Sequence, residues 1–310
     1  MRFFCLIPVL ALLPSLVAQV KVTSASDRIM VEIDGKPFGD LIFGGDAWKP
    51  YFHPLRSASG KIVTRRFPME VVEGEPRDHN HHRGLWFGHI DTNGIDFWST
   101  DPLNKPNPKF GKIVVRRVND VKSGKKSGSL TATFDWNHPD GHTMLTEVRT
   151  MTFYSDPKLR IIDFDATLTP KEQIYFGDDK DGFFALRVAK ELQEQGGTGV
   201  ITNADGLRGE KMVWGKPSNW ADYSGTLEGE SVGFAIFDHP GNPHHPTRWH
   251  ARAYGLFSAN PFGSQTFSPT NPQGGLTVKA GEPVRFRYRV IIHPAGVDLA
   301  EMYKKWEKTK

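Results

Sequence analysis

The sequence predicts an all-β protein, a large antiparallel sandwich of two sheets that ends in one short helix. Three observations lead to this prediction. Roughly a dozen stretches have the extended, period-two character of strands. Glycine- and proline-containing turns separate these stretches. Only residues 298–308 show helical spacing together with a capping residue.

The first extended run covers residues 27–43, where Asp34-Gly35 predicts a hairpin turn. Three later runs show the same alternation of apolar with polar side chains. Their apolar members are Leu130, Ala132, Phe134 and Trp136; Ile162, Phe164, Ala166 and Leu168; and Val284, Phe286, Tyr288 and Val290. One polar and one apolar face per strand is typical of a sandwich layer. At the C-terminal end, Asp298 can cap a helix that places Leu299, Met302 and Trp306 near one face.

Residues 1–18 have the pattern of a secretory signal peptide: Arg2, then an apolar core, then Ala18. We therefore expect export to the periplasm or the exterior, and a single β-sandwich domain over 19–310. The one cysteine, Cys5, lies in the predicted signal, so the remaining chain has no disulfide, thiolate nucleophile or cysteine metal site.

Charge gives little indication of a macromolecular partner. Lys and Arg number 39 and Asp and Glu 35, a net charge of +4, and the charges are interspersed. No nucleic-acid recognition motif accompanies them, so we expect no nucleic-acid partner. The sequence does not indicate an oligomeric state.

The largest concentration of side chains that could bind or catalyse lies in residues 78–98. This segment contains His79, His81, His82, Arg83 and His89 with Trp86 and Trp98, and the pair Asn93-Gly94 favours a tight turn. A core strand tolerates such imidazoles and an arginine only if they are paired or face a ligand. The segment is either the floor of a pocket or a hydrogen-bonded histidine cluster that braces a loop.

A second concentration covers residues 238–252, with His239, Arg248, Trp249 and His250. Its prolines predict an extended path held by turns. Residues 51–55, with Tyr51 and His53, form either a pocket wall or a packed loop. We predict that the two histidine-containing segments meet in one hollow.

Histidines paired with carboxylates transfer protons, while tryptophan faces stack on sugar rings and arginines bind hydroxyls. We therefore predict a saccharide or modified sugar as the ligand, and a hydrolase, lyase or epimerase reaction. The predicted catalytic residues are His79, His81, His82, Arg83, His239 and His250. The predicted substrate-binding residues are Trp86, Trp98, Asp178, Asp181, Trp220, Asp222, Arg248 and Trp249.

Two alternatives remain open at this point. His79 and His81, two residues apart on an extended segment, could hold a divalent metal with a third ligand such as His239, His250 or a carboxylate. The protein could also bind a sugar without catalysing a reaction, since stacking aromatics suffice for binding. The density of titratable groups favours catalysis.

Several motifs in this order resemble a bacterial family labelled PmoA-like, or "methane oxygenase PmoA". They occupy residues 51–55, 78–98, 177–182, 184–189, 220–225 and 237–263, and the resemblance extends from about 51 to 293. It implies a galactose-mutarotase-like supersandwich and a role in sugar chemistry, and it supplies no catalytic residues. Residues 19–310 contain no apolar run long enough to cross a bilayer, so we expect neither a membrane span nor methane oxidation.

Overall fold

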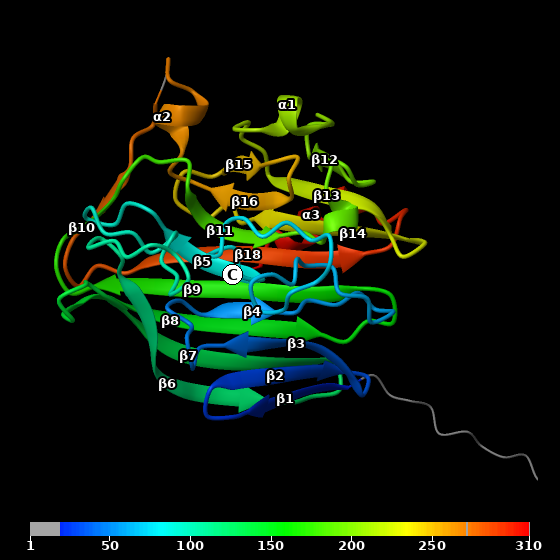
Figure 1. Ribbon diagram of the computed structural model, residues 1–310, viewed down its shortest axis with the longest axis horizontal. Coiled ribbons are helices and arrows are strands. Elements are labelled where there is room, and N and C mark those ends of the chain that lie inside the picture. Colours follow the sequence, from blue (N-terminus) through cyan, green and yellow to red (C-terminus); the bar gives the residue numbers. More distant parts are fainter. Residues whose placement is uncertain (1–18, 271, 310) are drawn as a thin grey trace, which may run out of the picture.

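The computed structural model describes residues 19–270 and 272–309, so the predicted signal peptide lies outside the described residues (Figure 1). Two eight-stranded antiparallel sheets account for most of the chain. In Figure 1 the strands β1–β3 lie over the green strands of the other sheet. The predicted all-β, two-sheet antiparallel architecture is confirmed.

Sheet 1 combines strands from residues 20–89 with strands from residues 182–260. In spatial order its strands are β1 (Val20–Ser24), β2 (Arg28–Ile33), β3 (Lys36–Ile42), β4 (Tyr51–His53), β5 (Leu85–His89), β11 (Gly182–Arg187), β16 (Leu256–Asn260) and β15 (Arg248–Ala251). The predicted hairpin joins β2 and β3, with Asp34 and Gly35 at positive φ in its turn.

Sheet 2 contains the longer strands. Its order is β12 (Val200–Asn203), β13 (Trp220–Leu227), β14 (Glu230–Asp238), β18 (Val284–His293), β9 (Arg160–Pro170), β8 (Thr143–Tyr154), β7 (Ser127–Asn137) and β6 (Lys112–Lys122). A small ribbon pairs β10 (Ile174–Phe176) with β17 (Leu276–Val278). The predicted alternation is confirmed on β7, β9 and β18, whose inward side chains are buried.

The inward faces of both sheets meet in one hydrophobic core that includes Phe87 and Leu186 from sheet 1 and Trp136 and Phe164 from sheet 2. The outer face of each sheet is not part of this core. The helix α3 (Leu299–Trp306) covers part of the outer face of sheet 2, where it packs on Phe237.

The C-terminal helix begins as predicted: the carboxylate of Asp298 accepts the Glu301 N–H at 2.9 Å. The other helical turns are short: η1 (Lys190–Leu192), α1 (Glu210–Val213) and α2 (Ser264–Phe267). The helices α1 and α2 lie at the end of the molecule near β15 (Figure 1). Within the described residues, no helix has the length and apolar character needed to cross a bilayer.

Candidate functional site

The outer face of sheet 1 brings the two histidine-containing segments onto one surface. Cross-strand register pairs Tyr51 with Trp86, Trp86 with Ala185, Ala185 with Ser258, and Ser258 with His250. Direct cross-strand neighbours share a face. The row therefore crosses β4, β5, β11, β16 and β15, strands that follow one another in Figure 1. Three strand spacings separate Trp86 from His250, roughly 14 Å.

A small apolar cluster supports the middle of this face. Trp86, Trp98, Tyr51, Ala185 and Leu256 are buried together there, separately from the core between the sheets. Trp86 and Trp98 are each only 1% exposed. The sequence predicts that these two rings stack on a sugar. They instead lie beneath the imidazoles and support them, and they present no open face to a ligand.

Above this cluster, the rings of His82, His79 and Tyr254 continue the aromatic packing that starts at Trp86. His82 stacks on Trp86 at 5.0 Å between ring centroids, and His79 stacks on His82 at 4.7 Å. Tyr254, from the turn between β15 and β16, stacks on His79 at 5.5 Å. His81 meets His82 edge-on at 4.4 Å. Tyr254 thus joins the β15–β16 turn directly to the 78–98 segment.

The most exposed of these imidazoles, His79, is paired with a carboxylate. Its Nδ1 lies 2.5 Å from Asp78 Oδ2, and 42% of its side chain is exposed. Because an ionised carboxylate only accepts, His79 Nδ1–H donates, which leaves a lone pair on Nε2. This is the arrangement of a histidine oriented for general acid-base catalysis.

Two buried arginines hold the Asp78 carboxylate. Arg65 Nη1 donates to Asp78 Oδ1 at 2.9 Å, and Arg187 Nη2 donates to the same oxygen at 3.2 Å. Burial alone would raise the pKa of Asp78, but the hydrogen bond from His79 and the positive charges of Arg187 and Arg65 hold this pKa well below its usual range. Asp78 therefore stays ionised and keeps His79 in one tautomer.

Arg65 also shapes the turn that presents His79. Its guanidinium donates to the backbone carbonyls of Asp78 at 2.7 Å and His79 at 2.8 Å. His79 has a φ of +47°, in the left-handed region that few non-glycine residues adopt. Such backbone conformations persist where the surroundings fix them, often at functional sites.

His81 and His82 have a different role from His79. Arg187 Nη1 donates to His82 Nδ1 at 3.3 Å, so His82 is neutral with its proton on Nε2. Burial, together with nearby positive charges, lowers the pKa of both imidazoles well below the usual value. We assign these two rings to positioning, because they remain neutral and support His79.

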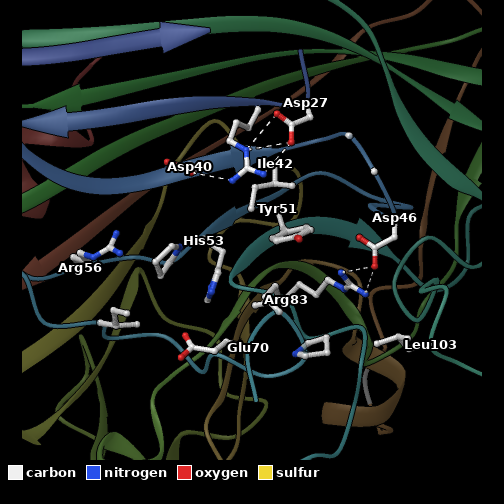
Figure 2. Close-up of a pocket in the computed structure, with 17 residues that line it drawn as sticks. Asp27, Asp40, Ile42, Asp46, Tyr51, His53, Arg56, Glu70, Arg83 and Leu103 are labelled. Carbon is white, nitrogen blue, oxygen red and sulfur yellow. Dashed lines mark hydrogen bonds and ion pairs between the residues drawn. The ribbon is translucent and has the colours of Figure 1, made fainter. Parts of the chain in front are cut away.

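A polar pocket of about 580 Å³ lies over β3 and β4 (Figure 2), and of the residues on this face Tyr51 and Arg83 line it. In Figure 2, His53 and Arg83 flank Tyr51, and Glu70 lies across from it. Arg83 donates to Asp101 at 2.6 Å and contacts Asp46 at 3.5 Å. Of residues 51–55, then, Tyr51 and His53 line a pocket wall, and Phe52 joins the core.

His53 is a buried neutral histidine in this pocket wall. Burial, reinforced by the charges of Arg56, Arg66 and Arg83, lowers its pKa to about 3. Its Nδ1 is buried without a hydrogen-bond partner among residues 19–270 and 272–309.

The pKa of His53 predicts an acid-sensitive contribution to stability. Its folded pKa of about 3 lies below the ordinary histidine value of about 6.5, so the unfolded chain binds the extra proton between these two pH values. Stability should fall as the pH drops below 6.5, by about 1.4 kcal/mol per pH unit for one such group. Urea unfolding of the wild type and His53→Gln at pH 7 and pH 4.5 measures this. The variant should lose less stability over this interval than the wild type, and equal losses would contradict the assignment.

His250 lies at the far end of the row. Its Nδ1–H donates to the Lys180 carbonyl at 2.8 Å, and Asp181 Oδ1 is 3.7 Å from the same nitrogen. Burial lowers the pKa of His250 to about 4, although the charge of Asp181 opposes this shift. Arg248, on the same strand, donates to the Gly215 carbonyl at 3.0 Å.

The remaining predicted site residues do not lie on the outer face of sheet 1, so the prediction that they line one hollow with the histidines is wrong for them. Trp249 is fully buried between the sheets, because it alternates with His250 along β15. Trp220 and His239 pack near α3 on the outer face of sheet 2, where Asp222 contacts His293 at 3.2 Å. Asp178 accepts hydrogen bonds from Ser264 and Gln265 at the start of α2.

The alternative of a metal site at His79 and His81 has no third converging ligand atom among the described residues. Among the described residues, the only group of three or more converging ligand side chains is His138, Asp140 and His142, in another part of the molecule. Sequence reasoning also missed Arg65, Arg187 and Tyr254. Arg187 ends the apolar run 183–186, and a charge at the end of a buried strand is the signal that could have found it.

The chain has low similarity to several solved structures. A GH36 α-galactosidase, AgaA, from Geobacillus stearothermophilus has a TM-score of 0.45 and 11% identity, with 89% of this chain and 40% of that chain covered. A galactose mutarotase-like protein from Clostridium acetobutylicum has a TM-score of 0.43 and 9% identity, covering 89% and 98%. A galactose mutarotase related enzyme from Lactobacillus acidophilus has a TM-score of 0.36 and 9% identity, with 90% of this chain and 98% of that chain covered.

These similarities assign no chemistry to this chain, which spans 40% of the length of the α-galactosidase. No curated protein matches the sequence. The family model that matches does not carry the PmoA-like label, which stays a prediction from the motifs. Residues 28–307 match the model of a family of unknown function (DUF6807), and the chain belongs to that family.

Proposed function

We propose that this protein is an exported enzyme that binds a saccharide or modified sugar on the outer face of sheet 1 and uses His79 for proton transfer. The observation that carries the proposal is the Asp78–His79 pair, with its carboxylate held by two buried arginines and its imidazole partly exposed. The pattern of residues 1–18 supports export.

In the proposed reaction, the Nε2 lone pair of His79 removes a proton from a hydroxyl group or from a carbon beside a carbonyl. The imidazolium that forms is stabilised by the adjacent negative charge of Asp78. Arg65 and Arg187 keep that carboxylate ionised and in place. The imidazolium then gives the proton to the oxygen whose bond to carbon breaks: the ring oxygen when a hemiacetal opens, or the expelled oxygen in an elimination.

The pocket over β3 and β4 supports a ligand with many hydroxyl groups. Arg83 offers hydrogen-bond donors, while Asp46 and Glu70 offer acceptors, and all three line the pocket. Apolar surface comes from the side chains of Ile42, Met69 and Leu103. A sugar presents both hydroxyl edges and C–H faces, so it matches this mixed lining.

Among the predicted reaction classes, the geometry favours a lyase or an epimerase over a hydrolase. Common glycoside hydrolases place two free carboxyl groups about 5–10 Å apart around the bond that is cleaved. The carboxylate beside the proposed proton-transfer group, Asp78, is committed to His79, Arg65 and Arg187, so the free group at that position is an imidazole and not a carboxyl. A single imidazole can carry a proton from the carbon beside a carbonyl to an expelled oxygen, which is an elimination. It can also carry a proton from the anomeric hydroxyl to the ring oxygen, and the opened ring then recloses with the inverted configuration.

A substrate panel tests this proposal. The purified protein is incubated with neutral sugars, uronic-acid oligosaccharides and aryl glycosides, and products are followed by NMR and polarimetry while calorimetry measures binding. We expect elimination or inversion of at least one sugar. Calorimetric binding to the outer face without any product would favour a sugar-binding protein, and the absence of both binding and product would refute the sugar assignment.

A further inference from the structure

The hairpin between β7 and β8 carries a second histidine cluster that the proposed reaction does not use. The hairpin tip reads His138-Pro139-Asp140-Gly141-His142. Two backbone hydrogen bonds close the turn: the His138 N–H donates to His142 and the Gly141 N–H donates to His138, both at 2.9 Å. Gly141 has a φ of +97°, which suits glycine. The turn therefore places the two imidazoles side by side, with centroids 4.7 Å apart.

Three ligand atoms converge at this tip. Asp140 Oδ1 lies 3.0 Å from His138 Nδ1 and 2.7 Å from His142 Nδ1, and all three atoms lie within 4.8 Å of one another. A metal bound at about 2.1 Å to each of two ligands holds them about 3.0 Å apart at a right angle, as in square-planar sites, and about 3.4 Å apart in tetrahedral sites. The separations from Asp140, 3.0 Å and 2.7 Å, are close to the right-angle value and would widen slightly around a tetrahedral ion.

Glu172 provides a second, independent observation. It comes from the segment between β9 and β10, and its Oε2 lies 3.7 Å from His142 Nε2. A histidine that binds a metal through one ring nitrogen usually directs its other N–H to a carboxylate, which orients the ring. Glu172 lies beside the ring nitrogen that Asp140 does not contact, just beyond hydrogen-bond distance.

We propose that the β7–β8 hairpin binds a divalent transition metal through His138, Asp140 and His142, with Glu172 orienting His142. Two imidazoles and one carboxylate suit Zn²⁺, Ni²⁺ or Cu²⁺ better than Mg²⁺ or Ca²⁺, which prefer oxygen ligands. Three protein ligands leave open coordination positions. His138 also lines a groove of about 340 Å³ with Trp48 and Lys112, so a metal on His138 lies beside space for a small ligand.

Calorimetric titration with Zn²⁺ and Ni²⁺ tests the site on the full mature protein, produced without a polyhistidine tag. We expect one metal ion per chain. His138→Ala and His142→Ala should each weaken binding at least tenfold, and Glu172→Gln should weaken it by about 10-fold to 100-fold. His244→Asn is the matched control, because it removes an imidazole outside the cluster and should leave the affinity unchanged.

An NMR measurement gives a readout independent of affinity. The Asp140 N–H donates to His138 Nδ1 at 3.2 Å, and a metal would take over that lone pair. The Asp140 amide signal should therefore shift on Zn²⁺ addition in the wild type and not in His138→Ala. The proposal is overturned if the wild type binds neither ion below millimolar concentration, or if binding is equal in the wild type and both alanine variants.

Discussion

Replacing Glu147 with alanine is expected to lower the free energy of unfolding by about 3–5 kcal/mol, because it leaves the guanidinium of Arg149 unpaired inside the sandwich. Both side chains point from β8 into the core, where Glu147 is 0% and Arg149 2% exposed. Arg149 Nε donates to Glu147 Oε1 at 2.6 Å, and Trp136 Nε1 donates to the other carboxylate oxygen at 2.9 Å. The variant removes both acceptors at once.

The surroundings of Arg149 offer no other carboxylate contact within the described residues. Its guanidinium lies over the rings of Phe134 at 4.7 Å and Phe164 at 5.2 Å. These faces attract a cation, but they do not replace the lost hydrogen bonds. Glu147→Gln keeps an acceptor for Trp136 and should cost less than Glu147→Ala.

Urea unfolding measures the loss, and two further variants identify its origin. The double variant Glu147→Leu, Arg149→Met removes both charges and should be more stable than Glu147→Ala alone, because no buried charge remains unpaired. Glu32→Ala breaks the exposed pair with Lys21 and should cost only about 0–1 kcal/mol. A loss of less than about 1 kcal/mol in Glu147→Ala would show that the buried pair contributes little.

The same strand shows where reading the fold from the sequence reaches its limit. Alternation predicts β7, β9 and β18 because each presents apolar side chains to one side. On β8 the inward positions include Glu147 and Arg149, so its pattern is less clear. Pairing partners are also invisible to local patterns: β5 pairs with β11, more than ninety residues later.

The candidate site was predictable in part, for a reason that the fold makes clear. Within residues 78–98, His79, His81 and His82 lie next to one another along the chain and stay together. His89 lies on the other face of β5, where it packs on Phe183 and Phe262.

Residues 238–252 begin at the end of β14 in sheet 2 and end on β15 in sheet 1. His239 and His250 therefore lie on different outer faces, and alternation sends Trp249 into the core. The residue types in this segment do not indicate that the chain passes from sheet 2 to sheet 1. They also do not indicate which side chains of β15 point into the core.

Replacing His79 with asparagine is expected to lower kcat/KM by about 10²- to 10⁴-fold on the sugar that the panel identifies, because it removes the group that transfers the proton. Asparagine adopts the left-handed conformation that His79 has at φ +47°. Its amide nitrogen can also take the place of Nδ1 as the donor to Asp78. The variant thus removes Nε2 while keeping the turn and the pairing of Asp78.

A split between the kinetic constants separates catalysis from support of the fold. If His79 acts only in proton transfer, kcat should fall while calorimetric affinity for the sugar stays within about threefold. Asp78→Asn should also reduce kcat, since the neutral amide no longer stabilises the imidazolium. Thermal unfolding of each variant shows whether the packing around Arg65 and Arg187 is retained.

His245→Ala provides the matched control for this prediction. His245 forms a second Asp–His pair, with its Nδ1 2.7 Å from Asp238 Oδ2, but Asp238 also accepts the Thr247 N–H at 2.8 Å and fixes a turn outside the candidate site. Removing this imidazole should leave kcat unchanged. If His79→Asn keeps kcat within about fivefold of the wild type, His79 is not the proton-transfer group, and the pairing with Asp78 only fixes the turn that carries it.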